Sequence, residues 1–180
     1  MVFAINANGQ NSKNYFGRMT DTINSIIDSY GQQKIRYGLI VYGSKAVPRI
    51  QLTEIFSSDE QLKNFVEMVQ RSRGGADLAA ALESAKVMFS SEIPERRNVL
   101  VILTDSKATG DSAKIQPLAD ELHEMRVKVI TVAMGEESER SELRPLSPMK
   151  DNSVKEDPKE SPKQLGDRIM REAIKGEQLA

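Results

Sequence analysis

The sequence predicts an α/β fold with a doubly wound, mostly parallel central sheet, one antiparallel edge strand and helices on both faces. Apolar runs rich in β-forming residues alternate along the chain with segments whose apolar residues recur at helical spacing. The runs 98–105 and 127–135 are almost wholly apolar, which is typical of parallel strands buried on both faces. The runs 34–43 and 46–52 are separated by only two residues, which predicts a β-hairpin and hence the antiparallel edge.

The first third of the chain predicts a strand, a helix and this hairpin. Residues 2–6 form a short apolar run. From Phe16 to Tyr30, apolar residues recur at spacings of three and four, which predicts a helix with one buried face. Gly31 is suited to end that helix. Pro48 cannot donate a main-chain hydrogen bond, so the second hairpin strand is predicted to lie at the edge of the sheet.

Two helices are predicted between the hairpin and the central strand. Apolar residues within 62–69 indicate the first, with Ser58 or Asp59 as its N-cap. Residues 76–89 are rich in alanine, which favours a helix strongly. Asp77 stands at the start of that segment, where its carboxylate is expected to cap the helix.

The C-terminal part of the chain continues the alternation after the central strand. Apolar residues within 115–125 predict a helix, and Asp111 is expected to cap a helix that begins near Ser112. Residues 141–148 predict a short helix stopped by prolines, and the polar segment 149–162 is compatible with a weak edge strand and a loop. The last helix is predicted to begin near Ser161, since proline is favoured at a first helical position.

Composition excludes several classes of function. The 180 residues fit one domain, and 25 basic against 26 acidic residues give a net charge of -1, without the basic excess of a nucleic-acid or anionic-membrane surface. No apolar run is long enough for a membrane-spanning helix, and no signal-peptide pattern is visible. The chain has no cysteine, which excludes disulfides and thiolate metal sites. Because the first strand begins directly after Met1, we expect a domain cut from a longer protein.

Ligands of doubly wound sheets bind at the carboxyl ends of the strands, where three loops are expected: 6–12, 72–77 and 105–111. The sequence around these loops resembles the von Willebrand factor type A (vWA) domain family over essentially the whole chain, residues 1–176, with 177–180 as a tail. The stretches that carry the resemblance are "VFAINANGQNS", "RYGLIVYGSKAVPRIQL", "RGGADLAAALESAKVMF", "NVLVILTDSKATGD" and "VKVITVAMG".

The resemblance implies a binding site of defined composition, the metal-ion-dependent adhesion site, which holds Mg²⁺ or Mn²⁺ at this end of the sheet. In the family the first loop has the pattern Asp-x-Ser-x-Ser, the second supplies a Thr and the third an Asp. The matching positions here are Asn6, Asn8, Gln10, Ala76 and Asp105. Only Asp105 keeps the family's residue, so the site is predicted to be degenerate.

These replacements remove most of what a hard cation needs. Mg²⁺ takes six oxygen ligands, usually with one or two carboxylates. Asn6 exchanges one carboxylate for a neutral amide, and Ala76 offers no oxygen. Asn8 and Gln10 have carbonyl oxygens but longer side chains than serine, and their amides can instead hydrogen-bond one another. We therefore expect no metal and no cofactor, with weak Mg²⁺ or Ca²⁺ binding at Asp105 as the alternative.

The resemblance implies a non-enzymatic module that binds another protein, such as a matrix component, within a longer extracellular or secreted mosaic or collagen-like chain. The alternative is an intracellular vWA scaffold in a multiprotein complex, which the lack of cysteine fits equally well. No nucleic acid or membrane insertion is expected. An enzyme is not expected either, because His123, the only histidine, has no Ser or Cys partner in a nucleophile motif.

Overall fold

The computed structural model describes residues 1–7, 15–71, 74–91, 96–135, 143, 146 and 152–175. Six strands form one sheet in the order β3-β2-β1-β4-β5-β6. The strands are β1 (Val2–Asn6), β2 (Gly38–Tyr42), β3 (Ala46–Ile50), β4 (Asn98–Thr104), β5 (Val127–Ala133) and β6 (Ser153–Lys155). The helices are α1 (Tyr15–Lys34), α2 (Asp59–Glu67), α3 (Leu78–Ser90), α4 (Ile115–Glu124) and α6 (Pro162–Ile174), and a 3₁₀ turn at Ser112–Lys114 precedes α4.

The sheet has the mixed topology that the sequence predicts. β1 lies between β2 and β4 and is parallel to both, and β5 and β6 continue the parallel arrangement. Among the described strands, β3 alone is antiparallel to its neighbour, and it pairs with β2 at the edge, where Pro48 lies opposite Ile40. The predicted fold class is confirmed.

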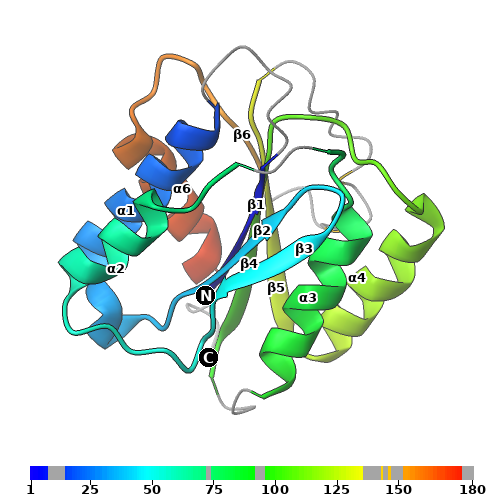
Figure 1. The fold of residues 1–180 in the computed structure, drawn as a ribbon, viewed down its shortest axis with the longest axis horizontal. Coiled ribbons are helices and arrows are strands. Elements are labelled where there is room, and N and C mark those ends of the chain that lie inside the picture. Colours follow the sequence, from blue (N-terminus) through cyan, green and yellow to red (C-terminus); the bar gives the residue numbers. More distant parts are fainter. Residues whose placement is uncertain are drawn as a thin grey trace.

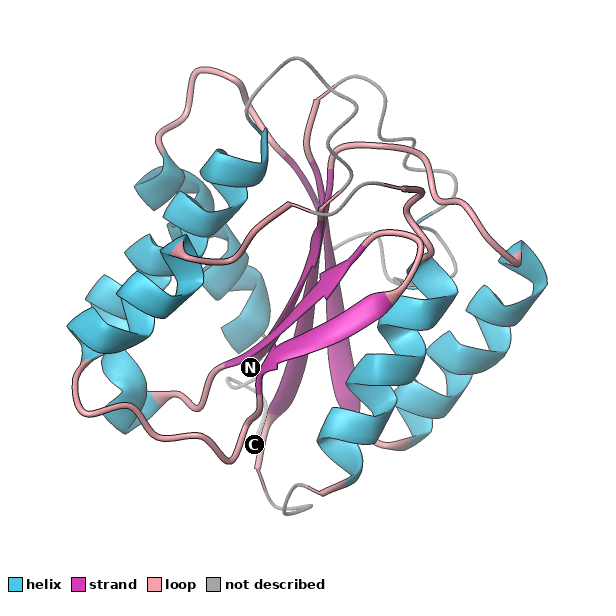
Figure 2. Ribbon diagram, in the orientation of Figure 1, coloured by secondary structure: helices cyan, strands magenta, loops and turns pink. Residues whose placement is uncertain are grey.

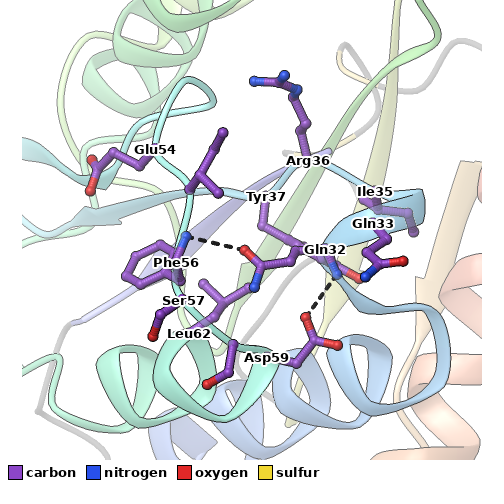
Figure 3. Close-up of a pocket in the computed structure, with 12 residues that line it drawn as sticks. Gln32, Gln33, Ile35, Arg36, Tyr37, Glu54, Phe56, Ser57, Asp59 and Leu62 are labelled. Carbon is purple, nitrogen blue, oxygen red and sulfur yellow. Dashed lines mark hydrogen bonds between the residues drawn. The ribbon is translucent and has the colours of Figure 1, made fainter.

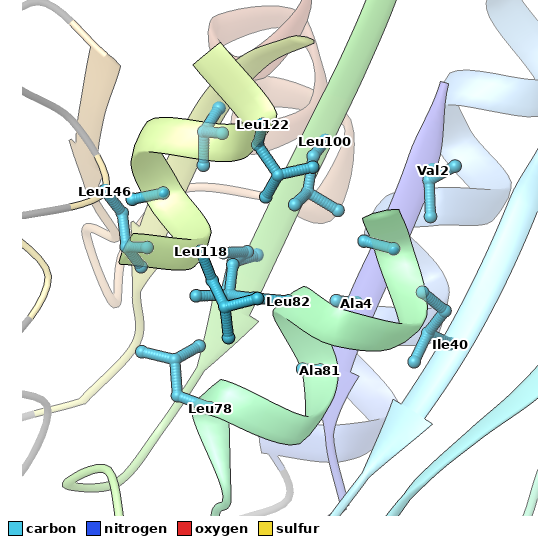
Figure 4. Close-up of a cluster of buried hydrophobic side chains, with 14 of the residues drawn as sticks. Val2, Ala4, Ile40, Leu78, Ala81, Leu82, Leu100, Leu118, Leu122 and Leu146 are labelled. Carbon is cyan, nitrogen blue, oxygen red and sulfur yellow. The ribbon is translucent and has the colours of Figure 1, made fainter. Parts of the chain in front are cut away.

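Helices cover both faces of the sheet (Figure 1). α1, α2 and α6 lie on one face, and α3 and α4 lie on the other. Because side chains alternate along a strand, β1 supplies both layers: Val2 and Ala4 pack in the cluster on the α3–α4 side, whereas Phe3 and Ile5 pack on the α1–α6 side. Figure 4 shows the first of these clusters, in which Leu82 and Leu118 fill the space between the helices and the sheet.

Helix starts follow the predicted capping residues. The side chains of Ser58, Asp77 and Ser161 accept a hydrogen bond from a main-chain N–H in the first turn of α2, α3 and α6. Asp111 caps the 3₁₀ turn Ser112–Lys114, whereas the N-cap of α4, Lys114, makes no side-chain cap hydrogen bond. The end of α1 differs slightly from the prediction. Gly31 has φ 65° and interrupts the helical backbone, but one further turn follows it. That turn is stabilised because the Asp59 carboxylate accepts a hydrogen bond from Gln32 N at 2.9 Å.

The polar segment 149–162 contains β6, as predicted for a weak edge strand. The predicted short helix at 141–148 lies outside the described residues except for Leu143 and Leu146, which are both buried. In the described part of the chain, no helix combines the length and the apolar composition needed to cross a membrane.

Candidate functional site

The candidate site lies where the parallel strands β1, β4 and β5 end (Figure 2). Of the five residues that the sequence assigns to it, Asn6, Ala76 and Asp105 are described, and Asn8 and Gln10 lie outside the described residues. Asn6 and Ala76 are each 1% exposed, and Asp105 is 4% exposed. Each stands at or just beyond the end of a strand, or just before α3, so the fold brings all three loops to one end of the sheet.

The side chain of Asn6 joins the end of β1 to the end of β4. Its Nδ2 donates to Thr104 Oγ1 at 3.1 Å and to Ser106 Oγ at 2.7 Å. Thr104 Oγ1 in turn donates to the main-chain oxygen of Ser106 at 3.0 Å. Thr104 and Ser106 flank Asp105 in the sequence, so a neutral hydrogen-bonding residue stands on each side of the one residue retained from the family pattern.

Tyr42, at the end of β2, is buried behind this group. The pKa of the Tyr42 hydroxyl is raised above its ordinary value, mainly by burial. A hydrogen bond with Thr104 lowers this pKa in part, and the negative charge of Asp105 raises it further. The end of β2 therefore interacts with Thr104, at the end of β4, and with the charge of Asp105 that follows it.

The loop before α3 is fastened to its neighbours on both sides. Ala76 N donates to Thr109 Oγ1 at 2.7 Å, and Thr109 N donates to Ala76 O at 2.8 Å. On the other side, Asp77 N donates to Gly43 O at 2.7 Å, next to the end of β2. Ala76 therefore keeps its place at the site although its methyl group cannot bind a ligand.

Two glycines allow this close approach. A Cβ on Gly75 would lie 2.2 Å from Thr109 Oγ1, and a Cβ on Gly110 would lie 2.8 Å from the Asp77 carboxylate. Gly110 also has φ 93°, a backbone conformation that other residues rarely adopt. The contact of Thr109 with the loop before α3 was not predicted from the sequence. Gly75, which packs against Thr109, and Gly110, which packs against Asp77, are the residues that could have indicated it.

The described side chains do not offer the set of oxygen ligands that a divalent cation requires. Mg²⁺ needs several oxygens that converge with carboxylate charge. Here the Asn6 amide directs its N–H groups at the Thr104 and Ser106 hydroxyls, and Ala76 presents a methyl group. Among the described residues, no group of three or more His, Cys, Asp or Glu side chains could hold a metal ion.

The comparisons with known proteins agree with this architecture. The sequence model of the family described as von Willebrand factor type A domain matches residues 1–167. Proximal thread matrix protein 1 from the mussel byssus is 19% identical with a TM-score of 0.78, and the match covers 96% of this chain and 44% of that chain. A second structure of that protein has a zinc-occupied MIDAS motif, the metal-ion-dependent adhesion site. It matches at 19% identity with a TM-score of 0.78, over 96% of this chain and 46% of that chain.

A bacterial structure gives the same result. A von Willebrand factor type A structure from Catenulispora acidiphila is 18% identical with a TM-score of 0.75, and the match covers 96% of this chain and 41% of that chain. The present chain therefore spans less than half the length of these solved structures. At such low identity the likeness shows the fold alone.

Proposed function

This chain belongs to the von Willebrand factor type A domain family, and we propose that it is a non-enzymatic protein-binding module of the adhesion or matrix-assembly type that binds its partner without a divalent cation. Its partner is another protein, contacted through the loops at the carboxyl ends of β1 and β4 and before α3. The match to a mussel byssus matrix protein supports a matrix role for a domain of this fold.

One observation carries the cation-free part of the proposal: the Asn6 amide bonds to the Thr104 and Ser106 hydroxyls. An amide can donate and accept, so it pairs with neighbouring hydroxyls at the position where the family places a carboxylate. This pairing holds the ends of β1 and β4 together without a positive ion between them. Binding then depends on the shape and polarity of the surface rather than on a shared metal.

The binding loops stand on a rigid base, which suits recognition by shape. The loop before α3 is bonded to Gly43 on one side and to Thr109 on the other. A loop whose main chain is already ordered loses less conformational entropy when a partner binds. The described parts of the loops before α3 and after β4 therefore offer a preformed surface, and Lys107 and Thr109, both exposed, extend it.

Thermal unfolding with Mg²⁺, Mn²⁺ or Ca²⁺ at millimolar concentration tests the proposal. We expect no shift in the native chain, whereas the combined variant Asn6→Asp, Asn8→Ser, Gln10→Ser and Ala76→Thr should be stabilised by about 2.7 kcal/mol at 100 times its Kd. Adding Asp105→Ala to that variant is the control and should abolish the shift. A metal-dependent shift in the native chain that Asp105→Ala removes would overturn the cation-free proposal.

We place this module outside the cell, in a longer matrix or mosaic chain. A second candidate, an intracellular scaffold domain of a multiprotein complex, is equally compatible with the cysteine-free sequence. Antibody labelling of the full-length protein on intact and permeabilised cells distinguishes them. Labelling of intact cells or their surrounding matrix supports the first candidate, and labelling only after permeabilisation supports the second.

A further inference from the structure

Two adjoining cavities lie at the opposite end of the sheet from the candidate site. The larger has a volume of about 620 Å³ and lies between the start of β1, the start of β4 and the last turns of α6. The smaller, of about 360 Å³, lies between the end of α1 and the segment that leads into α2 (Figure 3). Gln32, Gln33, Ile35 and Arg36 line both cavities, so the two form one elongated depression, called here the basal groove.

The larger cavity of the basal groove is positively charged. Its lining includes four basic residues, Lys34, Arg36, Arg96 and Arg97, and no acidic residue among the described residues that line it. All four side chains are exposed. On a chain whose net charge is only -1, this gives the larger cavity a local positive potential, whereas Glu54 and Asp59 line the smaller cavity.

Two of the guanidinium groups are positioned by neutral main-chain oxygens. Arg36 Nη1 donates to Leu52 O at 3.5 Å, and Arg97 Nη1 donates to Ala173 O at 3.2 Å. A carbonyl oxygen fixes the direction of the Arg36 guanidinium but leaves its charge in place. The pKa of nearby Lys128 is lowered, first by burial and then by the charge of Arg97, which is consistent with a positive potential at this end.

The basal groove also presents apolar surface at each end and along its floor. Ile55 is 79% exposed in the smaller cavity, and Ile174 is 46% exposed in the larger. Between them, Val99 and Met170 are buried side chains that line the larger cavity. Large apolar side chains exposed beside a basic rim are typical of a surface that a partner covers.

We propose that the basal groove binds an extended acidic segment of a partner protein, in which carboxylate side chains alternate with apolar ones. Arg36, Arg96 and Lys34 pair with the carboxylates, and the apolar floor and the two exposed isoleucines pack against the apolar side chains. The exposed amide of Gln33, at the junction of the two cavities, can donate to and accept from the segment's main chain. A simple phosphate would use the basic residues alone, whereas the length and apolar floor of the basal groove fit a chain. This surface is independent of the candidate site at the other end of the sheet.

Fluorescence anisotropy with a labelled peptide of alternating Glu and Leu tests this proposal. We expect binding that weakens as salt concentration rises, because the charged groups lie at the surface. Lys34→Glu combined with Arg96→Glu should weaken binding by about tenfold or more, and Ile174→Ser should also weaken it. Lys45→Glu combined with Lys159→Glu makes the same charge change on exposed residues elsewhere and should have little effect.

Peptides and vesicles of other chemistry complete the test, and thermal unfolding confirms that each variant is folded. A peptide with Lys in place of Glu should not bind, and one with Ser in place of Leu should bind more weakly than the original. The proposal would be overturned if the two double variants, at Lys34 with Arg96 and at Lys45 with Lys159, lost the same peptide affinity. Absence of peptide binding would also overturn it. Binding to phosphatidylserine vesicles without binding to the peptide would also overturn it and indicate a lipid surface instead.

Discussion

Asn6 Nδ2 lies 2.7 Å from Ser106 Oγ, and this hydrogen bond joins the end of β1 to the loop that follows β4. The same nitrogen donates to Thr104 Oγ1, so one amide satisfies two hydroxyls. Asp105 lies between these two residues in sequence and is buried. Because Asn6 is neutral, the two strand ends can approach each other without placing two carboxylates together. The free energy of unfolding of variants at position 6 measures how much this neutrality contributes.

Asn6→Asp should destabilise the domain at neutral pH by about 2 kcal/mol, because it places a second buried carboxylate close to Asp105 and removes the two N–H donors. Burial and the neighbouring charge both raise the pKa of the new carboxyl above that of the unfolded chain. The unfolded state therefore binds fewer protons, and the destabilisation should shrink as the pH falls. Urea unfolding at neutral and acidic pH measures the difference.

Asn6→Leu is the matched control, since it keeps the number and branching of the side-chain heavy atoms but has no charge and no hydrogen-bonding groups. Its destabilisation should change little with pH. If Asn6→Asp and Asn6→Leu lose the same free energy at every pH, the loss of the hydrogen bonds explains the effect and the proximity of Asp105 does not.

The layers of this fold could be predicted because they follow from local pattern. Strand segments such as 98–105 are almost wholly apolar and helices show one apolar face, so the spacing of apolar residues predicts the type and order of the elements. Capping residues such as Asp77 and Ser161 act within one helical turn and were predictable for the same reason. The exact end of α1 was not, because the turn after Gly31 depends on Asp59, which comes from another helix.

The candidate site was predictable in position but not in contacts. Parallel strands place their carboxyl ends together, which brings the three loops to one end of the sheet. The partners of Asn6 and the pairing of Ala76 with Thr109 depend on how those loops approach in space. Sequence spacing carries no information on the direction of a hydroxyl or amide, so these contacts required the structure.

Thr109→Val should lower the free energy of unfolding by about 1 kcal/mol. The change keeps the size and branching of the side chain but removes the oxygen that accepts from Ala76 N at 2.7 Å. Ala76 is buried, so water can replace that acceptor only poorly. Chemical denaturation measures the loss, and Thr109→Ser, which keeps the hydroxyl, should lose less. Equal losses in the two variants would show that the methyl group, rather than the hydroxyl, holds the loop.

Glu156→Ala should be among the most damaging single changes, with a loss of about 3 kcal/mol. Glu156 forms an ion pair with Arg18, and their side chains are 2% and 21% exposed. Arg18 also donates to the main-chain oxygen of Asp157 at 3.2 Å, so this pair connects α1 to the segment after β6. Removing the carboxylate leaves a guanidinium partly buried without its anion. Urea unfolding measures the loss.

The exposed pair on α6 provides the comparison for Glu156. Lys163 and Asp167 lie one helical turn apart at 3.0 Å, with side chains 68% and 44% exposed. Solvent screens such a pair, so Asp167→Ala should cost less than about 0.5 kcal/mol. A loss from Glu156→Ala as small as that from Asp167→Ala would show that the buried pair contributes little to the attachment of the segment after β6.

Tyr37→Phe should leave stability at neutral pH nearly unchanged and increase it at alkaline pH relative to the native chain. The Tyr37 ring is 5% exposed and stacks on Phe3, and its buried hydroxyl has no hydrogen-bond partner among the described residues, so Phe can replace it without losing a contact. Burial first, and then the charge of Asp59, raises the pKa of that hydroxyl above its ordinary value of 10.0. The unfolded chain therefore releases this proton first, and stability that is fully present below pH 10 is lost as the pH rises beyond it.

Urea unfolding between neutral and alkaline pH should give a smaller alkaline loss for Tyr37→Phe than for the native chain, while Tyr42 retains its own contribution in both. Parallel loss of stability in the two proteins would show that Tyr37 ionises as readily in the folded state as in the unfolded one.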